Sequence, residues 1–353
     1  MSLQKEIFKK PPIAPASRPT GGAASTLEVE NDAARSQVGT FHPATWTDFF
    51  ETSRDVHVPA SDATFRVYQT GSATGPLFVF HHGGGHTALS WSLVARLLKK
   101  QTIGGCSILC FDCRGHGDTR TSDDSDLSLE RLSQDMANLM DVLYDKQLPS
   151  DVVLVGHSMG GAVVVDAATR NSIKNLLGVA IIDVVEGTAM ESLAHMEVYL
   201  RNRPSRLSSL QAAIQWSLQS GSIKNLESAR ISVPPQLKPV ISDQGQTTHY
   251  EWKTNLSASQ PYWKGWFQDL SSKFLAVRCA RMLVLAGTDR LDTPLTIGQM
   301  QGKYQLVLHP ESGHAIQEDE PDKLAATLTE FWQRNGPMKV IKRFPIPPKK
   351  PVE

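Results

Sequence analysis

The sequence predicts an α/β protein whose mostly parallel, twisted sheet is covered on both faces by helices. Two observations predict this class. Short apolar runs rich in Val, Ile and Leu, typical of strands buried on both faces, recur along the chain. Segments with helical spacing of apolar residues lie between these runs. Such alternation of strand and helix is typical of parallel sheets built from strand–helix–strand units.

The expected elements follow one another in order along the chain. Alternating residues at 54–57 and 64–70 predict an opening hairpin. Buried strands are expected at 76–80, 107–112, 152–155, 177–183, 281–286 and 304–308, and helices at 91–100, 129–143, 162–169 and 321–334. The last helix has Pro321 near its start and Gly336 just past its end, which is the usual asymmetry of helix termini.

The same pattern divides the chain into five segments. Residues 1–40 mix Pro, Ser, Ala, Gly and Lys without hydrophobic periodicity, and we expect a disordered arm. Residues 41–185 and 276–336 are the two parts of the α/β core. An insertion at 186–275 separates them and is expected to form a cap over the strand ends, where such sheets bind ligands. The Pro- and Lys-rich tail at 337–353 is incompatible with helix or central strand.

The insertion contains several kinds of sequence. Helical patterning is present near 190–200 and 207–216, whereas 233–248 is rich in Pro, Gln and Gly and is expected to be mobile. Its last part holds a group of aromatic residues: Tyr250, Trp252, Tyr262, Trp263, Trp266 and Phe267. Two interpretations of this group stay open, since it could line a substrate groove or form a small core within the cap.

Composition and charge exclude several classes of function. The 353 residues contain 36 Lys and Arg against 36 Asp and Glu, so the formal net charge is zero and there is no basic footprint for nucleic acid or anionic membranes. The longest apolar runs are strand-sized, shorter than the stretch of about 20 residues that spans a bilayer. The lysine-rich start lacks the apolar segment of a secretory signal. We expect a cytoplasmic protein, and the sequence leaves open whether it also enters the nucleus.

The four cysteines do not indicate a metal or redox site. Cys110 and Cys113 form a C-x-x-C, but no second Cys or His pair follows at the spacing of a zinc site. Residues three apart on a strand also face opposite sides of the sheet. The sequence therefore predicts reduced thiols and no metal.

A Gly-x-Ser-x-Gly string at 156–160 lies between a predicted strand and a predicted helix. The apolar run 152–155 leads into it, and a helix of small and apolar residues follows. Strand, sharp turn and helix together predict a nucleophile elbow, with Ser158 at its tip. Gly156 and Gly160 leave the space that so tight a turn needs. The N-terminal N–H groups of the following helix would face a developing negative charge on a substrate oxygen.

A serine nucleophile needs a base within hydrogen-bonding reach and an acid that orients the base. Among eleven histidines, His314 is the main candidate for the base because it follows the last strand in a loop. For the acid, Asp183 ends the strand after the elbow helix, whereas Asp289 and Asp292 follow the next core strand. Spacing alone slightly favours Asp289. Unused aspartates would cap turns or helix ends.

Backbone N–H groups complete the expected chemistry. The glycine loop at 83–85 can turn N–H groups toward Ser158, with Gly84 as one oxyanion donor and the N–H of Met159 as the second. A phosphate-binding role for this loop is disfavoured because no Gly-Lys-Ser/Thr follows. His157 is expected to point away from the nucleophile, and His116 and His309 are expected to be structural.

Several strings resemble a known family. The motifs at 82–86, 112–117, 156–161 and 313–314 are similar to those of α/β-hydrolases generally. More specific strings are IDVVEGTAM at 182–190, NLESAR at 225–230, AGTDRLD at 286–292 and LTIGQMQGK at 295–303. They resemble the protein phosphatase methylesterase family, and the resemblance extends from about residue 41 to residue 334.

The resemblance implies an α/β-hydrolase fold with an inserted cap and a specific reaction. The implied reaction removes the methyl ester from the C-terminal leucine of the type 2A protein phosphatase catalytic subunit, which would be both substrate and partner. The family places its nucleophile at Ser158, its base at His314 and its acid at Asp183, so the resemblance favours Asp183 over Asp289. No metal or organic cofactor is implied.

Two other functions remain as alternatives. One is a general esterase or peptidase that acts on small substrates. The other is a module that binds and inhibits the phosphatase with vestigial catalysis.

Overall fold

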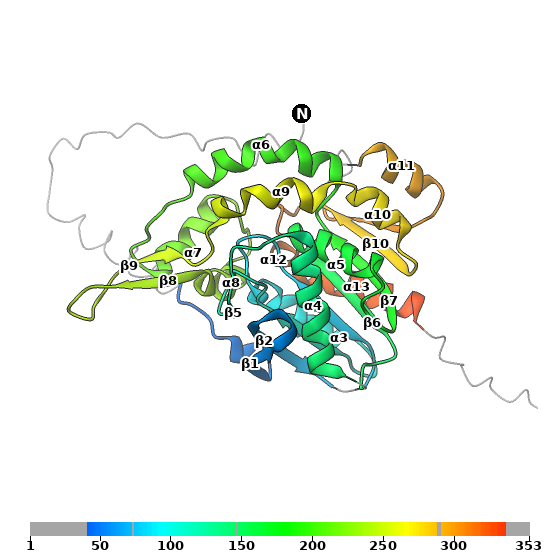
Figure 1. Ribbon diagram of the computed structural model, residues 1–353, viewed down its shortest axis with the longest axis horizontal. Coiled ribbons are helices and arrows are strands. Elements are labelled where there is room, and N and C mark those ends of the chain that lie inside the picture. Colours follow the sequence, from blue (N-terminus) through cyan, green and yellow to red (C-terminus); the bar gives the residue numbers. More distant parts are fainter. Residues whose placement is uncertain (1–40, 73, 146, 288–290, 337–353) are drawn as a thin grey trace, which may run out of the picture.

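The computed structural model of the chain describes residues 41–72, 74–145, 147–287 and 291–336 (Figure 1). The arm predicted at 1–40 and the tail predicted at 337–353 therefore lie outside the described residues, as does Asp289. The described residues contain a large mixed sheet, helices on both of its faces and a long insertion between two of its strands.

The large sheet has nine strands and is mostly parallel. Its order is β1 (Thr52–Val58), β2 (Ala63–Gly71), β4 (Ser107–Phe111), β3 (Leu77–His81), β6 (Val152–His157), β7 (Leu176–Ile182), β10 (Ala280–Leu285) and β11 (Gln305–Leu308), and β5 (Arg120–Thr121) pairs with β2. Only the pairings of β2 with β1, β4 and β5 are antiparallel. From β4 to β11 all neighbours run parallel. The predicted α/β class is confirmed.

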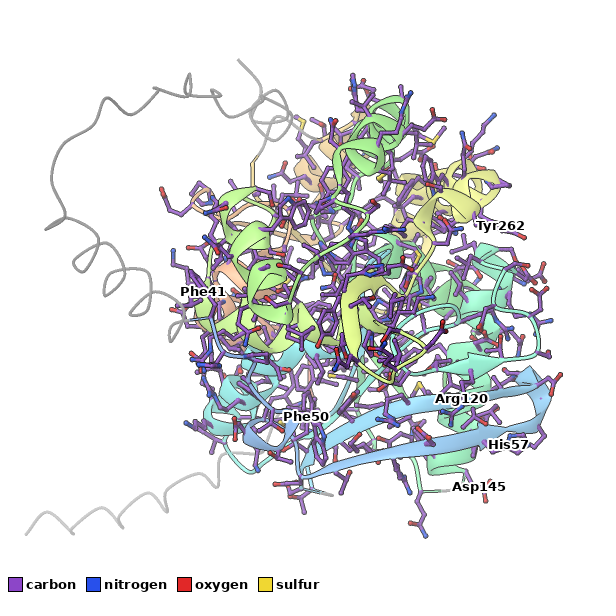
Figure 2. All side chains as sticks on the ribbon, turned by 90° about the vertical axis from the view of Figure 1, so that its left-hand side faces the viewer. Phe41, Phe50, His57, Arg120, Asp145 and Tyr262 are labelled. Carbon is purple, nitrogen blue, oxygen red and sulfur yellow. The ribbon has the colours of Figure 1, made fainter. Side chains whose placement is uncertain are left out.

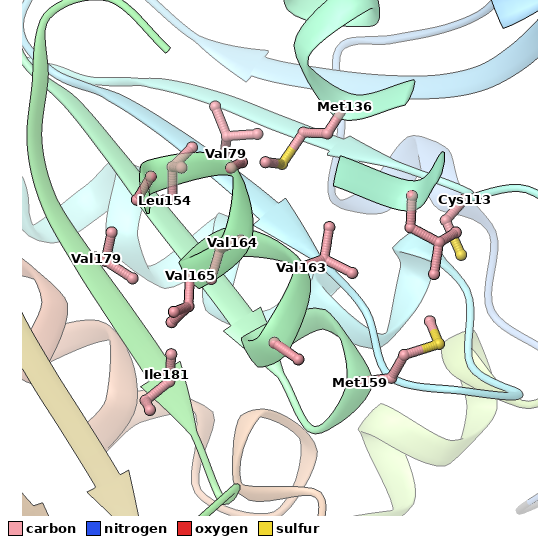
Figure 3. Close-up of a cluster of buried hydrophobic side chains, with 14 of the residues drawn as sticks. Val79, Cys113, Met136, Leu154, Met159, Val163, Val164, Val165, Val179 and Ile181 are labelled. Atoms are coloured by element: carbon pink, nitrogen blue, oxygen red, sulfur yellow. The ribbon is translucent and has the colours of Figure 1, made fainter. Parts of the chain in front are cut away.

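Helices bury both faces of this sheet, as the uninterrupted apolar strands predict. One face packs on α4 (Leu129–Tyr144), α5 (Met159–Thr169) and α10 (Leu270–Ala276), and the other on α3 (Ser92–Gln101) and α13 (Pro321–Asn335). Alternate residues of β6 serve the two faces: Leu154 belongs to the first core, and Val153 and Val155 belong to the second. Figure 3 shows the valines of α5 packed among residues of the first core.

The insertion lies between β7 and β10 in sequence. It contains α6 (Glu186–Asn202), α7 (Leu210–Gln219), α8 (Leu226–Ser232), η4 (Pro234–Gln236), β8 (Leu237–Ile241), β9 (Thr247–Trp252), η5 (Leu256–Ser259) and α9 (Gln260–Phe267). Figure 2 shows Tyr262 of α9 in the upper part of the molecule, whereas Phe50, His57 and Asp145 lie in the lower part. The insertion contacts the loop after β11, since Lys224 Nζ donates to the Glu311 carbonyl at 2.7 Å.

The remaining short elements connect these layers. They are η1 (Trp46–Asp48), η2 (Pro59–Ser61), η3 (Ala88–Trp91), α11 (Thr293–Met300) and α12 (Ile316–Asp319).

The stretch 233–248, for which the sequence predicts mobility, contains regular structure. It forms η4, β8 and the start of β9, and β8 and β9 pair as a two-stranded antiparallel hairpin visible at the left of Figure 1. Leu237 is the one buried residue of β8, where it joins a small core under α7 and α8. Backbone pairing, Leu237 and the partly buried Tyr250 and Trp252 of β9 hold the hairpin, and the polar composition of 233–248 gives little sign of it.

Half of the aromatic group of the insertion is buried. The side chains of Trp263, Trp266 and Phe267 are buried in the core that covers α4 and α5. Trp266 Nε1 also donates to the carbonyl of Leu127 at 2.7 Å, which attaches α9 to the start of α4. These three residues therefore contribute to packing, whereas Tyr250, Trp252 and Tyr262 remain part-exposed.

Candidate active site

Ser158 stands at the predicted turn between β6 and α5. Its φ of 52° and ψ of −118° lie outside the regions that L-residues favour, which is typical of strain held at a functional position. A Cβ added to Gly156 would lie 2.1 Å from the carbonyl oxygen of Gly160, so the turn is too tight for a side chain there. Helix α5 begins at Met159, three residues earlier than the pattern predicts, so its N-terminus immediately follows the serine.

Asp183 and His314 meet beside this turn. Asp183 follows β7 and His314 follows β11, and Asp183 Oδ2 accepts from His314 Nδ1 at 2.8 Å. The other carboxylate oxygen accepts the N–H of Ala286 at 3.0 Å. The aspartate side chain is fully buried, whereas that of His314 is 45% exposed. A buried acid thus fixes the orientation of an imidazole that substrate can reach.

The structure separates the acid candidates that it describes. Asp292 is the N-cap of α11, where it accepts the N–H of Leu295 at 3.0 Å, and its second oxygen accepts from Ser271 Oγ at 2.5 Å. This is the helix-capping role expected of an unused aspartate. Asp289 lies outside the described residues. Between Asp183 and Asp292, only Asp183 is placed to orient His314.

Ser158 and His314 lie in neighbouring loops but are not hydrogen-bonded to each other in the part of the chain that the structure describes. The ring of His157 lies 4.7 Å from that of His314, and its Nε2 donates to the His314 carbonyl at 2.9 Å. Catalytic hydrogen bonds are often long in free enzymes and tighten when substrate binds.

The glycine loop packs against the elbow. A Cβ added to Gly160 would lie 2.3 Å from the carbonyl oxygen of His81, which shows how closely α5 approaches the end of β3. The N–H of Gly85 donates to His116 Nε2 at 2.9 Å. Across the described residues, the N–H groups of Gly84 and Met159 have no such acceptor. The two N–H groups predicted as oxyanion donors are thus available beside Ser158.

Buried histidines support both loops. His116 orients Gly85, and His82 Nε2 accepts the N–H of Cys113 at 3.0 Å. Burial lowers the pKa of His81 and His116 to about 4 and that of His157 well below its ordinary value, so these rings are neutral. The sequence predicts that His157 points elsewhere. Its Nε2 donates to the His314 carbonyl, a role for which the sequence holds no signal beyond the position of His157 next to Ser158.

A buried glutamate of α12 joins the glycine loop to α8. Glu318 Oε1 lies 3.2 Å from His86 Nδ1 in the glycine loop, and Oε2 accepts from Ser232 Oγ at 2.5 Å at the end of α8. The Glu318 carbonyl accepts from Ser228 Oγ at 2.7 Å. Burial raises the pKa of Glu318. Sequence analysis missed this residue, which lies four positions after His314 and has no motif of its own.

Two further properties of the described residues concern membranes and metals. None of their helices is both long enough and apolar enough to cross a bilayer. No group of three or more His, Cys, Asp or Glu side chains among them is placed to hold a metal ion. Cys110 and Cys113 are buried free thiols, and burial raises the pKa of each.

Comparison with known proteins agrees with this fold and site. A family model described as the alpha/beta hydrolase family matches residues 78–327. The solved structure of E-2-(acetamidomethylene)succinate hydrolase superposes with a TM-score of 0.64 and 21% identity, covering 79% of this chain and 98% of that one. At this identity the likeness shows the fold alone. The chain is an α/β-hydrolase.

Curated relatives narrow this class to one family. Protein phosphatase methylesterase 1 of Bos taurus is 39% identical over 355 residues, which cover 90% of this chain and 92% of that protein. The protein of the same name from Gibberella zeae is 45% identical over 316 residues, covering 86% of this chain and 76% of that protein. The chain belongs to the protein phosphatase methylesterase family and is a carboxylic ester hydrolase.

Proposed function

We propose that this chain hydrolyses the methyl ester on the C-terminal leucine of the type 2A protein phosphatase catalytic subunit, using Ser158, His314 and Asp183. Relatives at 39% and 45% identity carry the name protein phosphatase methylesterase 1, which supports a methylated phosphatase as substrate. The observation that carries the catalytic assignment is the 2.8 Å contact of Asp183 with His314 next to the elbow serine.

In the first half of the reaction, Ser158 Oγ attacks the ester carbonyl carbon while His314 Nε2 takes the serine proton. Asp183 accepts from Nδ1 and so keeps the imidazole in the tautomer whose Nε2 is a base. The same carboxylate stabilises the imidazolium that forms. Because the aspartate is buried and its second oxygen is held by the Ala286 N–H, the imidazole keeps its orientation throughout.

The developing oxyanion needs donors that are already in place. The N–H groups of Gly84 and Met159 would bind it, helped by the positive end of α5. The loss of one such donor typically raises the barrier by about 3 kcal/mol.

Collapse of the tetrahedral intermediate releases methanol, which takes its proton from His314. Water then attacks the acyl-enzyme, with His314 as base, and the products are the free leucine carboxylate and regenerated Ser158. Side chains of the chain serve every proton transfer, so the proposal requires no cofactor.

Two substrates test the proposed specificity. The enzyme is given carboxymethylated type 2A phosphatase and, separately, a short aryl ester. We expect kcat/KM for the phosphatase to be much the larger. Efficient hydrolysis of the aryl ester with none of the phosphatase would instead indicate a general esterase.

A further inference from the structure

Arg203, directly after α6, carries a positive charge that has no acidic partner among the described residues. Its guanidinium carbon lies 3.4 Å from the centroid of the Trp252 ring, so the two groups are stacked. Its Nε atom is buried and without a hydrogen-bond partner. Another arginine of α6, Arg201, is by contrast exposed and lies 3.7 Å from the carboxylate of Glu197.

An unpaired guanidinium in such surroundings is costly. Burial disfavours its charged form and lowers the pKa of Arg203 to about 10, although the group remains charged at neutral pH. Stacking on an indole ring offsets part of this cost, but it uses only the face of the guanidinium. Stacking leaves the N–H groups in the guanidinium plane able to bind a carboxylate through two parallel hydrogen bonds.

The chain that follows Trp252 connects this group to the active site. Thr254 Oγ1 donates to the Gly115 carbonyl at 3.0 Å, and a Cβ added to Gly85 would lie 2.7 Å from the Leu256 side chain. The charge of Arg203 is also one of those that act on His116, the ring that holds the Gly85 N–H. Arg203 therefore lies on the side of the insertion that faces the glycine loop, within reach of a substrate chain that enters the site.

We propose that Arg203, stacked on Trp252, binds an acidic side chain of the substrate a few residues before its esterified C-terminus. The inference rests on the proposed function, because it assumes that the substrate is the end of a polypeptide. A carboxylate fits better than a phosphate. The neighbouring Lys253 is paired with Asp118 at 2.6 Å, so it does not add the second positive charge that would favour a phosphate.

A peptide series tests the inference in the wild-type enzyme. Peptides that end in leucine methyl ester carry one Asp, moved through the upstream positions, and each is compared with the same peptide carrying Asn. We expect one position at which Asp lowers KM about tenfold, the usual advantage of a hydrogen bond between charged groups, with little change in kcat. Equal hydrolysis of every Asp and Asn pair overturns the inference and leaves the proposed function intact. Hydrolysis of none of the peptides, or of the phosphatase, overturns the proposed function itself.

Variants then assign the preference to one residue. Arg203→Met should abolish the preference for Asp, whereas the matched Arg201→Met should keep it. Arg203→Lys, which keeps the charge, should retain part of it. Persistence of the full preference in a folded Arg203→Met enzyme would exclude Arg203 as its source. Because the peptide series uses the wild type, it decides the question even where a variant folds poorly.

Discussion

Asp183 Oδ2 lies 2.8 Å from His314 Nδ1, although 131 residues separate the two in the sequence. They meet because β7 and β10 are neighbours and parallel, as are β10 and β11, so the loops at the carboxyl ends of these strands share one edge of the sheet. The contact singles out Asp183 from Asp292 as the residue that can orient the base.

Asp183→Asn should lower turnover on methylated phosphatase by about 10⁴-fold, because an amide favours the wrong imidazole tautomer. Turnover of the purified variant with saturating substrate is the measurement. Asp292→Asn is the matched control, and we expect it to keep its turnover and nearly all of its stability, because Asn caps a helix about as well as Asp does.

Asp289→Asn extends the same comparison to the other candidate. We expect it to keep near wild-type turnover. A collapse of turnover in Asp289→Asn with an active Asp183→Asn would reverse the assignment.

Glu318 should position the loops of the site without touching substrate. Glu318→Ala leaves His86 and Ser232 without their buried partner, so we expect kcat for a short aryl ester to fall about tenfold to a hundredfold. KM should change little. Glu318→Gln keeps an acceptor and should recover part of kcat, whereas equal losses in both variants would show that charge, and not position, is the essential property.

Stability should depend on pH through His116. The pKa of His116 is about 4 in the folded chain against 6.5 in an unfolded one, because burial disfavours the charged ring. The contribution of the neutral ring to the free energy of unfolding is therefore fully present above pH 6.5 and is lost as pH falls toward 4. The charged groups that act on it are His86, Asp124 and Arg203. Denaturant unfolding of the wild type and of His116→Gln at pH 7 and pH 5 measures the effect.

The wild type must be compared with His116→Gln because a second buried group, Asp112, changes stability with pH in the opposite direction. Burial raises the pKa of Asp112 to about 6, so its contribution is lost as pH rises through the same window. The wild type should lose more stability on acidification than His116→Gln, by at most about 3 kcal/mol. Equal losses would mean that the ring is not held neutral by the fold.

Trp266 should act through packing and not through substrate. Trp266→Phe removes the hydrogen bond to the Leu127 carbonyl and leaves a small cavity, so we expect a loss of about 1–3 kcal/mol in the free energy of unfolding. KM for the phosphatase should be unchanged. An increased KM at unchanged stability would restore the interpretation of this tryptophan as part of a substrate groove.

The sequence predicts the core of the fold because the residues of each core strand alone indicate whether that strand is buried. The runs at 77–80 and 152–155 are apolar without interruption, and only a strand buried on both faces suits them. The elbow is predictable for the same reason, since strand, glycines and helix are contiguous. The β8–β9 hairpin is not predicted because it depends on pairing between strands and on the packing of Leu237, Tyr250 and Trp252 in the small core under α7 and α8.

Relationships across the sheet edge are less accessible from sequence. Asp183 and Asp289 both follow core strands that end at this edge, so sequence spacing alone does not decide which of them is the acid. The resemblance to a family favours Asp183. His116, His157 and Glu318 hold the loops through single hydrogen bonds to backbone or side chains far away in sequence, and no local pattern encodes such a bond.

The most direct test of the account is the release of labelled methyl groups from carboxymethylated type 2A phosphatase by the wild type and by Ser158→Ala. The account predicts release by the wild type and none above background by the variant, with both proteins folded and with equal melting temperatures. Release by Ser158→Ala at the wild-type rate would contradict the assignment of the nucleophile. If neither protein released methyl groups while the wild type cleaved an aryl ester, the proposed substrate would be wrong.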